Sequence, residues 1–289
     1  MELIEPTSHS YVAQRLRLNY VDWGSPEKPP LVLVHGGRDH CRNWDWTARK
    51  LREDWHVLAI DLRGHGDSDW VSDGNYLSSD CALDLCEFIE QLDLAPVTIV
   101  GHSFGGNVAL RYASAWPEKV RKLVVIEGLG LSPEAHAEMM RTPYHLRVRE
   151  WMQKKRALAG RAPRKYPDAE AAIARMQEAH PFLTHEQAAH LTRHGIRRQD
   201  DGSWRFKYDP ALTVFPAEDT AREDMESAWA AITCPVQLLY GAESWASDPS
   251  RDGRASHFRN AQTVVIEGAG HWLHHQQFDS YIMHLKEFL

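Results

Sequence analysis

The stretch that decides the fold is Val97–Leu110, which reads VTIVGHSFGGNVAL. Its first four residues form a continuous apolar run, typical of a strand that is covered on both faces of a parallel sheet. From Phe104 onward, the apolar residues have helical spacing. Between the two lies Gly101-His102-Ser103-Phe104-Gly105, a serine at a tight strand-to-helix turn. Such a turn needs the flanking glycines because the backbones on its two sides approach closely.

Similar apolar runs recur along the chain with helical patterns between them. The other five runs are Leu31–Gly37, His56–Gly64, Lys122–Gly128, Val236–Ala242 and Thr263–His271. The clearest helical patterns are Asp80–Leu92, Phe104–Ala115 and Phe278–Leu289. Alternating strands and helices with right-handed crossovers predict an α/β fold with a doubly wound, mostly parallel sheet. In such folds, ligand sites lie at the C-terminal ends of the strands.

A long interval in the second half of the chain lacks buried-strand runs. It contains helical patterns with start signals at Ser132, at Asp168 and at Thr184, the last with Gln187 three residues later. Residues Arg198–Asp209 carry a turn signal and predict a small hairpin. We expect this interval to form a helical cap over the strand ends. The predicted organisation is core (1–130), inserted cap (131–230) and core (231–289).

The composition restricts the classes of partner. The 289 residues include 33 Lys and Arg against 40 Asp and Glu, a formal net charge of −7. This balance gives no positive field, so we expect a small-molecule substrate and no nucleic-acid partner. The apolar runs are far shorter than the ~20 residues that span a bilayer, and the start MELIEPTSHS lacks the apolar region of a secretory signal. We therefore expect a cytoplasmic protein without a membrane segment, whose four cysteines are reduced.

The serine motif and the order of elements together resemble the α/β-hydrolase family, and the resemblance covers nearly the whole chain. The layout, with a cap inserted after the sixth strand of the family's sheet, is similar to that of haloalkane dehalogenases and epoxide hydrolases. Those enzymes form an alkyl ester on an aspartate nucleophile, and this chain has Ser103 in its place. The resemblance therefore implies acyl transfer through a serine nucleophile.

A serine hydroxyl is a poor nucleophile without a base, so a histidine is expected on a loop at a strand end. His271 follows the last strand-like run, and its place in the chain order matches the family's base. His274 and His275 lie close by, but no carboxylate or thiolate stands at ligand spacing. We therefore predict no metal site and no cofactor. Most of the other 16 histidines are expected on the surface or in the cap.

Acyl transfer also needs donors that stabilise the developing oxyanion. His35-Gly36-Gly37, directly after a strand-like run, resembles the HG-x loop of the family. The resemblance implies an oxyanion hole formed by the backbone N–H groups of Gly37 and Phe104. The segment Asp61–Ser68, DLRGHGDS, matches the family's D-x-R-G-x-G-x-S turn, and we interpret it as scaffold.

Two positions compete for the acid that orients the histidine. In most of the family this acid is an Asp three residues after the glycine of a later strand, where this chain has Ser244 with Glu243 beside it. A minority, including many haloalkane dehalogenases, has the acid one strand earlier, where this chain has Glu127. A carboxylate that ends an apolar strand of a buried sheet is costly unless it is paired. We favour Glu127 and keep Glu243 as the alternative.

The leading hypothesis is a serine hydrolase that cleaves a small, largely apolar carboxylic ester through an acyl-enzyme on Ser103. The alternatives are a thioesterase, a lactonase, a meta-cleavage-product (C–C bond) hydrolase, a cofactor-free perhydrolase and a noncatalytic receptor for a hydrophobic ligand. Four tryptophans follow strand ends, either as an aromatic pocket or as packing between cap and sheet: Trp44, Trp46, Trp245 and Trp272. The motifs do not separate these functions, and they indicate no oligomeric state.

Overall fold

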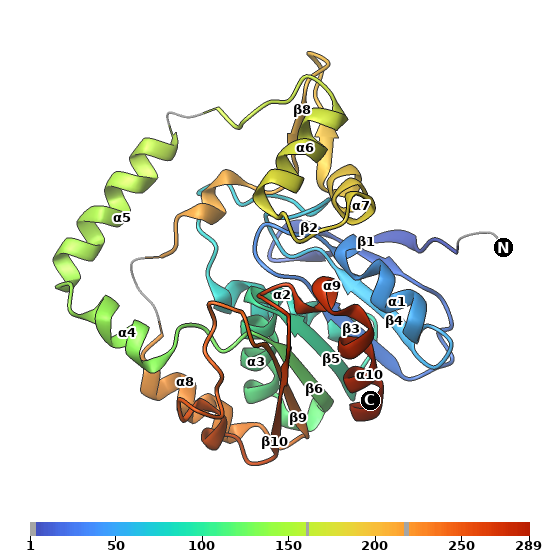
Figure 1. Ribbon diagram of the computed structural model, residues 1–289, viewed down its shortest axis with the longest axis vertical. Helices are drawn as coiled ribbons and strands as arrows, with labels where there is room; N and C mark the ends of the chain where they lie inside the picture. Colours follow the sequence, from blue (N-terminus) through green and yellow to red (C-terminus); the bar gives the residue numbers. More distant parts are fainter. Residues whose placement is uncertain (1–3, 160–161, 217–219) are drawn as a thin grey trace.

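The centre of the molecule is a twisted eight-stranded sheet (Figure 1). The computed structural model describes residues 4–159, 162–216 and 220–289. Strand β2 pairs antiparallel with both β1 and β4, and the other neighbours in the sheet are parallel. In sheet order, the strands are β1 (Thr7–Ala13), β2 (Leu16–Asp22), β4 (His56–Ile60), β3 (Pro30–Val34), β5 (Val97–His102), β6 (Val120–Ile126), β9 (Val236–Gly241) and β10 (Ala261–Ile266). The predicted α/β fold with a mostly parallel sheet is confirmed.

The six apolar runs all become strands, and the sheet has two further strands that the sequence did not indicate. These are β1 and β2, the antiparallel pair at one edge. The first four residues of β1, Thr7–Ser10, are polar and exposed. An edge strand needs no apolar residues on its open side, so its pattern does not show the continuous run of a central strand.

Helices cover both faces of the sheet, and each face has its own apolar core. On strand β3, Val32 and Val34 pack in one core cluster, whereas Leu31 and Leu33 pack in the other. This division follows from the two-residue period of a strand. One face is covered by α2 (Ser78–Gln91), α3 (Phe104–Ala115) and α8 (Arg222–Ala231), the other by α1 (Asp45–Leu51), α9 (Leu273–Gln276) and α10 (Phe278–Phe288).

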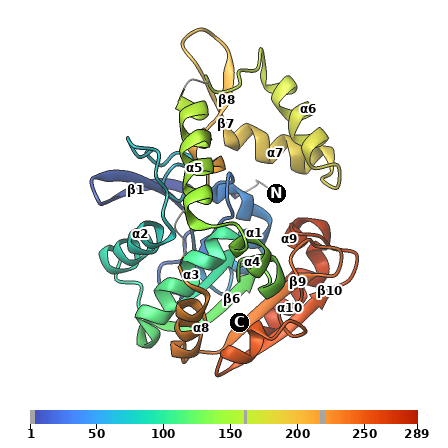
Figure 2. The same cartoon turned by 90° about the vertical axis from the view of Figure 1, so that its left-hand side faces the viewer.

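The segment between β6 and β9 contains the helices that lie over the C-terminal ends of the strands (Figures 1 and 2). Helix α7 begins with the predicted capping box, in which the side chains of Thr184 and Gln187 each bond the other residue's backbone N–H. The predicted hairpin is also present, as the antiparallel pair of β7 and β8. Besides α8 and a short 3-10 turn, the elements of this segment are α4 (Pro133–Met140), α5 (Tyr144–Ala159), α6 (Ala169–Ala179), α7 (His185–Gly195), β7 (Ile196–Arg198) and β8 (Trp204–Phe206).

Two parts of this segment differ in how they contact the rest of the molecule. Helices α4 and α5 form an arm along one side, and they contribute no buried residue (Figure 1). Helix α7 packs on the core, where His40 Nε2–H donates to the carbonyl oxygen of Leu191 at 2.8 Å and Gln187 Nε2–H donates to that of His275 at 3.2 Å. Helix α8, at the end of the expected cap range, packs against α3, with Trp229 in the core cluster. Short 3-10 turns complete the chain: η1 (Cys41–Trp44), η2 (Pro117–Lys119), η3 (Pro210–Thr213) and η4 (Arg254–His257).

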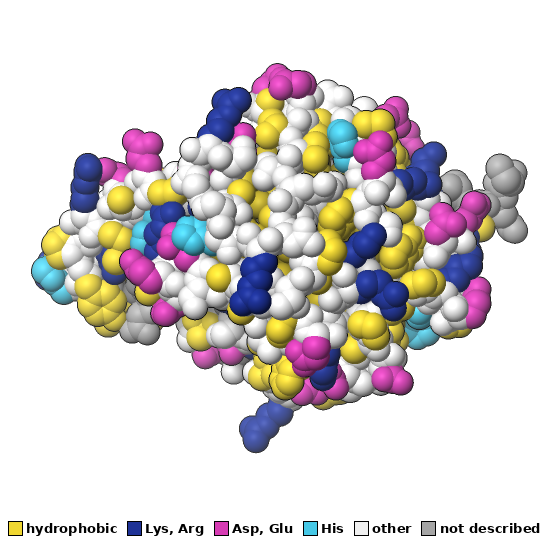
Figure 3. Space-filling view, turned by 90° about the horizontal axis from the view of Figure 1, so that it is seen from below, with side chains coloured by type: hydrophobic (Ala, Val, Ile, Leu, Met, Phe, Trp, Pro, Cys, Tyr) yellow, Lys and Arg dark blue, Asp and Glu magenta, His cyan; other side chains and the backbone are white. Residues whose placement is uncertain are grey.

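Three features of the structure relate to the expected environment and partners: the surface charges, the helix lengths and the state of the cysteines. Seen from below, acidic and basic side chains are interspersed over the face (Figure 3). None of the helices in the described ranges combines the length and the apolar character that crossing a bilayer requires. The four cysteines are all free thiols, and three of them are buried.

Candidate active site

Ser103 stands at the sharp turn between β5 and α3, at the C-terminal edge of the sheet. Its backbone has φ 50° and ψ −116°, a conformation that residues with a side chain rarely adopt. The turn passes so close to the end of β3 that a Cβ on Gly105 would collide with the carbonyl oxygens of Val34 and His35. The glycine spacing in the sequence therefore has a direct steric cause, and the strained turn presents the Ser103 side chain to the open end of the sheet.

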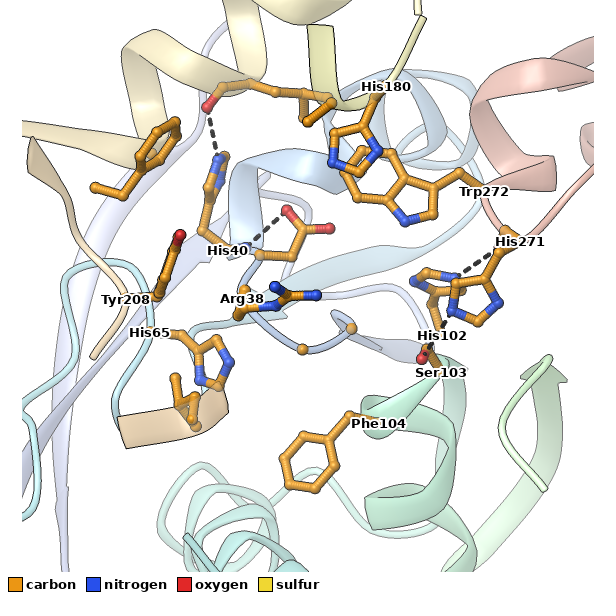
Figure 4. A pocket seen from close by; sticks show the side chains of 18 of the residues that line it. Arg38, His40, His65, His102, Ser103, Phe104, His180, Tyr208, His271 and Trp272 are labelled. Carbon is orange, nitrogen blue, oxygen red and sulfur yellow. Dashed lines mark hydrogen bonds between the residues drawn. The ribbon is translucent and has the colours of Figure 1, made fainter. Parts of the chain in front are cut away.

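His271 lies on the loop between β10 and α9, with its ring beside Ser103 (Figure 4). Its Nε2 is 3.0 Å from Ser103 Oγ. The loop is held in place by His102, whose Nε2–H donates to the carbonyl oxygen of His271 at 2.9 Å. The residue that precedes Ser103 in the chain therefore fixes the loop that carries the histidine.

Glu127 follows β6 and contacts the other nitrogen of the same ring. Its Oε2 is 2.5 Å from His271 Nδ1, and the side chain of Glu127 is buried. Because an ionised carboxylate can only accept, Nδ1 carries the proton and Nε2 is left to accept from the hydroxyl of Ser103. Gly241 N–H at 2.8 Å and Ser244 Oγ–H at 2.6 Å donate to the same carboxylate. The charge of Glu127 is thus fully hydrogen bonded, as a buried carboxylate requires.

The structure brings Glu127, and not Glu243, to the histidine. Glu243 is exposed on the loop after β9, and its backbone N–H bonds to Ala269 O at 2.9 Å. Ser244, which occupies the place of the acid in most of the family, is one of the donors that hold Glu127. A hydroxyl at position 244 therefore supports a carboxylate that comes from the neighbouring strand.

Gly37 and Phe104, the two residues that the resemblance implies for the oxyanion hole, line the same pocket as Ser103. Phe104 is the first residue of α3, so its N–H has no acceptor within the helix. The loop that carries Gly37 crosses close over the turn, since a Cβ on Gly36 would lie 2.8 Å from His102 Nδ1 and 3.3 Å from Ser103 Cβ. The loop that carries Gly37 and the first turn of α3 are therefore close to each other beside Ser103.

A pocket of about 780 Å³ opens over these residues, within the size range of small-molecule sites. Its floor comes from the strand ends, and its upper wall comes from the segment between β6 and β9. The residues of that segment that line it include Tyr166, Met176, His180, Phe182, Leu191 and Phe206. The lining thus combines many apolar and aromatic side chains with polar groups from both the core and this segment.

The four tryptophans at strand ends fall into two groups. Trp245 and Trp272 line the pocket, and the ring of Trp245 lies 4.9 Å from that of His271. Trp44 is fully buried in the core beside α1. Trp46 packs with Leu183 and Leu191 between the core and α7. Half of the set therefore serves packing, and half is in contact with the space where a ligand would bind.

The expectation that most other histidines lie on the surface or in residues 131–230 holds for nine of the 16, but a large group does not follow it. Seven histidines of the core are buried: His35, His40, His56, His65, His102, His274 and His275. His274 and His275 both donate from Nε2 to Asn43 Oδ1, at 3.0 and 3.1 Å, and so connect α9 to η1. Burial, followed by the neighbouring His190, lowers the pKa of His275 to about 3. These rings act as neutral packing groups with a hydrogen-bonding edge.

One group in the described residues has the spacing of metal ligands, and the sequence patterns did not indicate it. Ligand atoms of Asp45, His190 and His194 all lie within 4.8 Å of one another, where α1 meets α7. The guanidinium of Arg42 already bonds this carboxylate, with Nε 2.9 Å from both oxygens of Asp45. The carboxylate of this group is thus already paired with a cationic side chain.

Comparisons with known proteins agree with this architecture. Residues 31–281 match the model of the Alpha/beta hydrolase family, so the chain belongs to that family. Esterase Rv0045c of Mycobacterium tuberculosis is 29% identical over 253 residues, which cover 86% of this chain and 78% of the relative. Esterase YbfF of Escherichia coli is 26% identical over 271 residues, or 90% and 92% of the two chains. With these relatives and this fold, the chain is a hydrolase.

Solved structures show the same fold over the full length. The "Thioesterase Domain From Curacin Biosynthetic Pathway" superposes with a TM-score of 0.81 at 23% identity, covering 98% of this chain and 99% of the other. At that identity, the likeness concerns the fold alone.

Proposed function

We propose that the protein is a serine hydrolase that cleaves a small, largely apolar carboxylic ester through an acyl-enzyme on Ser103. The observation that carries the proposal is the continuous hydrogen-bonded chain from Ser103 Oγ through the His271 ring to Glu127, with distances of 3.0 and 2.5 Å. A nucleophile, a base and an orienting acid in this order are what serine acyl transfer requires.

In the first half of the reaction, Ser103 Oγ attacks the ester carbonyl carbon while its proton passes to His271 Nε2. The imidazolium that forms is stabilised by the Glu127 carboxylate at Nδ1. The carbonyl oxygen becomes an oxyanion, which accepts hydrogen bonds from the N–H groups of Gly37 and Phe104. When the C–O bond to the alcohol breaks, the leaving alkoxide takes the proton from Nε2, and the acyl group stays on Ser103.

In the second half, water attacks the acyl-enzyme and gives its proton to His271 Nε2. The same two N–H groups stabilise the second oxyanion. Collapse of this intermediate breaks the bond to Ser103 Oγ, which recovers its proton from the imidazolium. The products are one alcohol and one carboxylic acid, and the residues return to their starting protonation states.

The shape of the pocket supports a small substrate. Residues 131–230, which we interpret as a cap, supply one wall of the pocket of about 780 Å³, and aromatic residues of both the cap and the core line it. Two curated relatives that bear the name esterase support an ester as the bond that is cleaved. A polymer would have to pass between the cap and the core to reach Ser103.

Hydrolysis of p-nitrophenyl butyrate tests the proposal. We expect the wild-type protein to release a burst of p-nitrophenol equivalent to the enzyme concentration when deacylation is the slower step. We expect Ser103→Ala to lose the burst and to lower kcat by at least about a thousandfold. Parallel assays with an acyl thioester, a lactone and a ring-cleavage dienone compare the alternatives. Dienone cleavage without ester turnover would overturn the assignment of the bond.

A further inference from the structure

The pocket contains a positive charge that the proposed reaction does not use. Three basic side chains line it: Arg38, Arg175 and Lys207. Lys207 Nζ is 2.7 Å from Asp67, and Arg175 pairs with Glu178 at 2.8 Å. For Arg38, no carboxylate lies within 4 Å in the ranges that the structure describes. The pocket thus has one unpaired guanidinium in a chain whose net charge is −7.

The two acids that line the pocket do not neutralise Arg38. Glu127 is occupied by His271, Gly241 and Ser244. Asp39 is buried, and its oxygens accept from the backbone N–H of His40 and from the Asn43 side chain. Burial raises the pKa of Asp39 to about 8, so at neutral pH it is mostly uncharged. The charge of Arg38 therefore faces the pocket without a counter-ion from the lining.

The backbone holds Arg38 in this position at a conformational cost. Its φ is 62°, in the left-handed region that a glycine would occupy without strain. Among the residues that the structure describes, seven other than glycine have positive φ, and the three that line the pocket are Arg38, Ser103 and Glu127. Strained residues gather where function requires a particular geometry. Arg38 shares this feature with the two residues whose positions the proposed reaction depends on.

The side chain of Arg38 extends from the loop into the pocket (Figure 4). Arg38 directly follows Gly37, whose backbone N–H is proposed to bind the oxyanion. Its field reaches the opposite wall, because the pKa of His180 is lowered first by burial and next by the charge of Arg38. His180 itself stacks on Trp272, with ring centroids 4.5 Å apart. The guanidinium and this aromatic pair therefore line the same pocket as Ser103.

We propose that Arg38 is a specificity-determining residue that binds a carboxylate of the substrate, so that the preferred substrate is an ester with one free carboxylate group. The inference rests on the proposed ester hydrolysis at Ser103. A guanidinium binds a carboxylate through two parallel hydrogen bonds, a geometry that suits a side chain with no protein partner. One unpaired guanidinium also matches one negative charge, whereas a phosphate monoester, with nearly two charges at pH 7, calls for more than one cation.

The test compares matched pairs of esters in a pH-stat. Monoethyl succinate, monoethyl glutarate and monoethyl adipate are paired with ethyl butanoate, ethyl pentanoate and ethyl hexanoate, which replace the carboxylate by a methyl group. Butanoyloxyacetate, also paired with ethyl butanoate, tests a carboxylate in the alcohol part. The measured quantity is the ratio of kcat/KM for the charged ester to kcat/KM for its neutral partner. In the wild-type protein, we expect this ratio to exceed about ten for at least one pair, the factor of one charge-assisted hydrogen bond.

The variant Arg38→Gln is expected to lower this ratio by about tenfold to a hundredfold, mainly through a higher KM for the charged ester. Arg38→Lys keeps the charge without the paired geometry and is expected to give an intermediate ratio. The matched control is Arg15→Gln, because Arg15 is also an arginine with positive φ, 68°, in the β1–β2 turn. The control is expected to leave the ratio unchanged.

Two outcomes would overturn the inference. A wild-type ratio near one or below for every pair means that no carboxylate is selected. A high ratio that Arg38→Gln leaves intact means that another group selects it. Either outcome, combined with turnover of neutral esters that depends on Ser103, leaves the proposed function in place. Absence of turnover for all esters would instead contradict the proposed function itself.

Discussion

Ser103 and Glu127 directly follow neighbouring parallel strands, and both have a positive φ, 50° and 49°. Each is anchored on the next strand of the sheet. Ser103 N–H donates to Ile126 O at 2.8 Å, and Glu127 N–H donates to Leu239 O at 3.0 Å. Both side chains contact the same His271 ring. The strained backbone therefore occurs at the two residues that position the groups on either side of this ring.

The positive φ of Ser103 predicts that replacing this residue by glycine relieves backbone strain and stabilises the fold. Ser103→Gly and Ser103→Ala both remove the hydroxyl, so both should lose ester turnover. Glycine adopts positive φ freely, so Ser103→Gly should be more stable than Ser103→Ala by about 1 kcal/mol. Urea denaturation measures the free energy of unfolding of both variants. Equal or reversed stabilities would show that the turn is not strained at this residue.

A second prediction concerns the acid that orients the histidine. Glu127→Gln keeps the shape but removes the charge that stabilises the imidazolium, so kcat should fall by on the order of 10³-fold. Glu243→Gln changes an exposed side chain and should keep near wild-type activity. Steady-state kinetics of the two variants decide between the two carboxylates. Intact turnover in Glu127→Gln with loss of activity in Glu243→Gln would reverse our assignment.

A third prediction separates two glycines of the site by their surroundings. A Cβ on Gly105 would meet backbone atoms of β3, which cannot move aside, so Gly105→Ala should be destabilised by about 3 kcal/mol or fail to fold. A Cβ on Gly37 meets nothing within 4 Å. Gly37→Ala should therefore fold normally, since its proposed contribution comes from the backbone N–H. Thermal unfolding of both variants tests this difference, and a stable Gly105→Ala would contradict the packing at the turn.

The buried histidines predict a loss of stability in mild acid. Burial is the first cause that lowers the pKa of each ring, to about 4 for His35 and His194 and to about 3 for His40, His65 and His275. The unfolded chain binds a proton at each of them near pH 6.5 and the folded chain does not. The contribution of these neutral rings to the free energy of unfolding is thus fully present above pH 6.5 and is lost as the pH falls below that value. From pH 6.5 to 5.5, each ring should contribute a loss of about 1 kcal/mol.

The measurement is the free energy of unfolding by urea between pH 8 and pH 5. The slope below pH 6.5 should correspond to several protons, and His275→Gln should reduce it by about one proton. His145→Gln, which changes an exposed residue of α5, is the control and should leave the slope unchanged. A wild-type slope of one proton or less would mean that the buried rings are protonated in the folded state.

Much of the sheet could be predicted from sequence because its central strands are buried on both faces. The runs around Val97 and Leu123 are apolar because both faces of each strand are buried. The turn at Ser103 has glycines because the backbones on its two sides approach closely. Both patterns can be recognised within a few residues of sequence. Strand β1 could not be found in this way, because its exposed edge accepts polar residues. The central strands and the turn at Ser103 could therefore be predicted from nearby residues. The edge strand could not, because contact with solvent removes the need for apolar residues.

The details of the site depend on contacts between distant segments. The choice between Glu127 and Glu243 stayed open in the sequence because it depends on Gly241 and Ser244, which lie more than a hundred residues beyond Glu127. The isolation of Arg38 could not be predicted either, since it depends on which carboxylates the fold places near the other pocket cations. A charge pattern along the chain shows the charges themselves but not their partners.

The proposed reaction depends on Ser103 as the nucleophile, and labelling with a fluorophosphonate tests this role most directly. The folded protein is incubated with the reagent, and the adduct is located by mass spectrometry of the intact chain and of its peptides. We predict one adduct per chain on Ser103, slowed by a competing ester and abolished in His271→Ala, which lacks the base. A folded protein that remains unlabelled, or an adduct on another residue with Ser103 unmodified, would contradict the account.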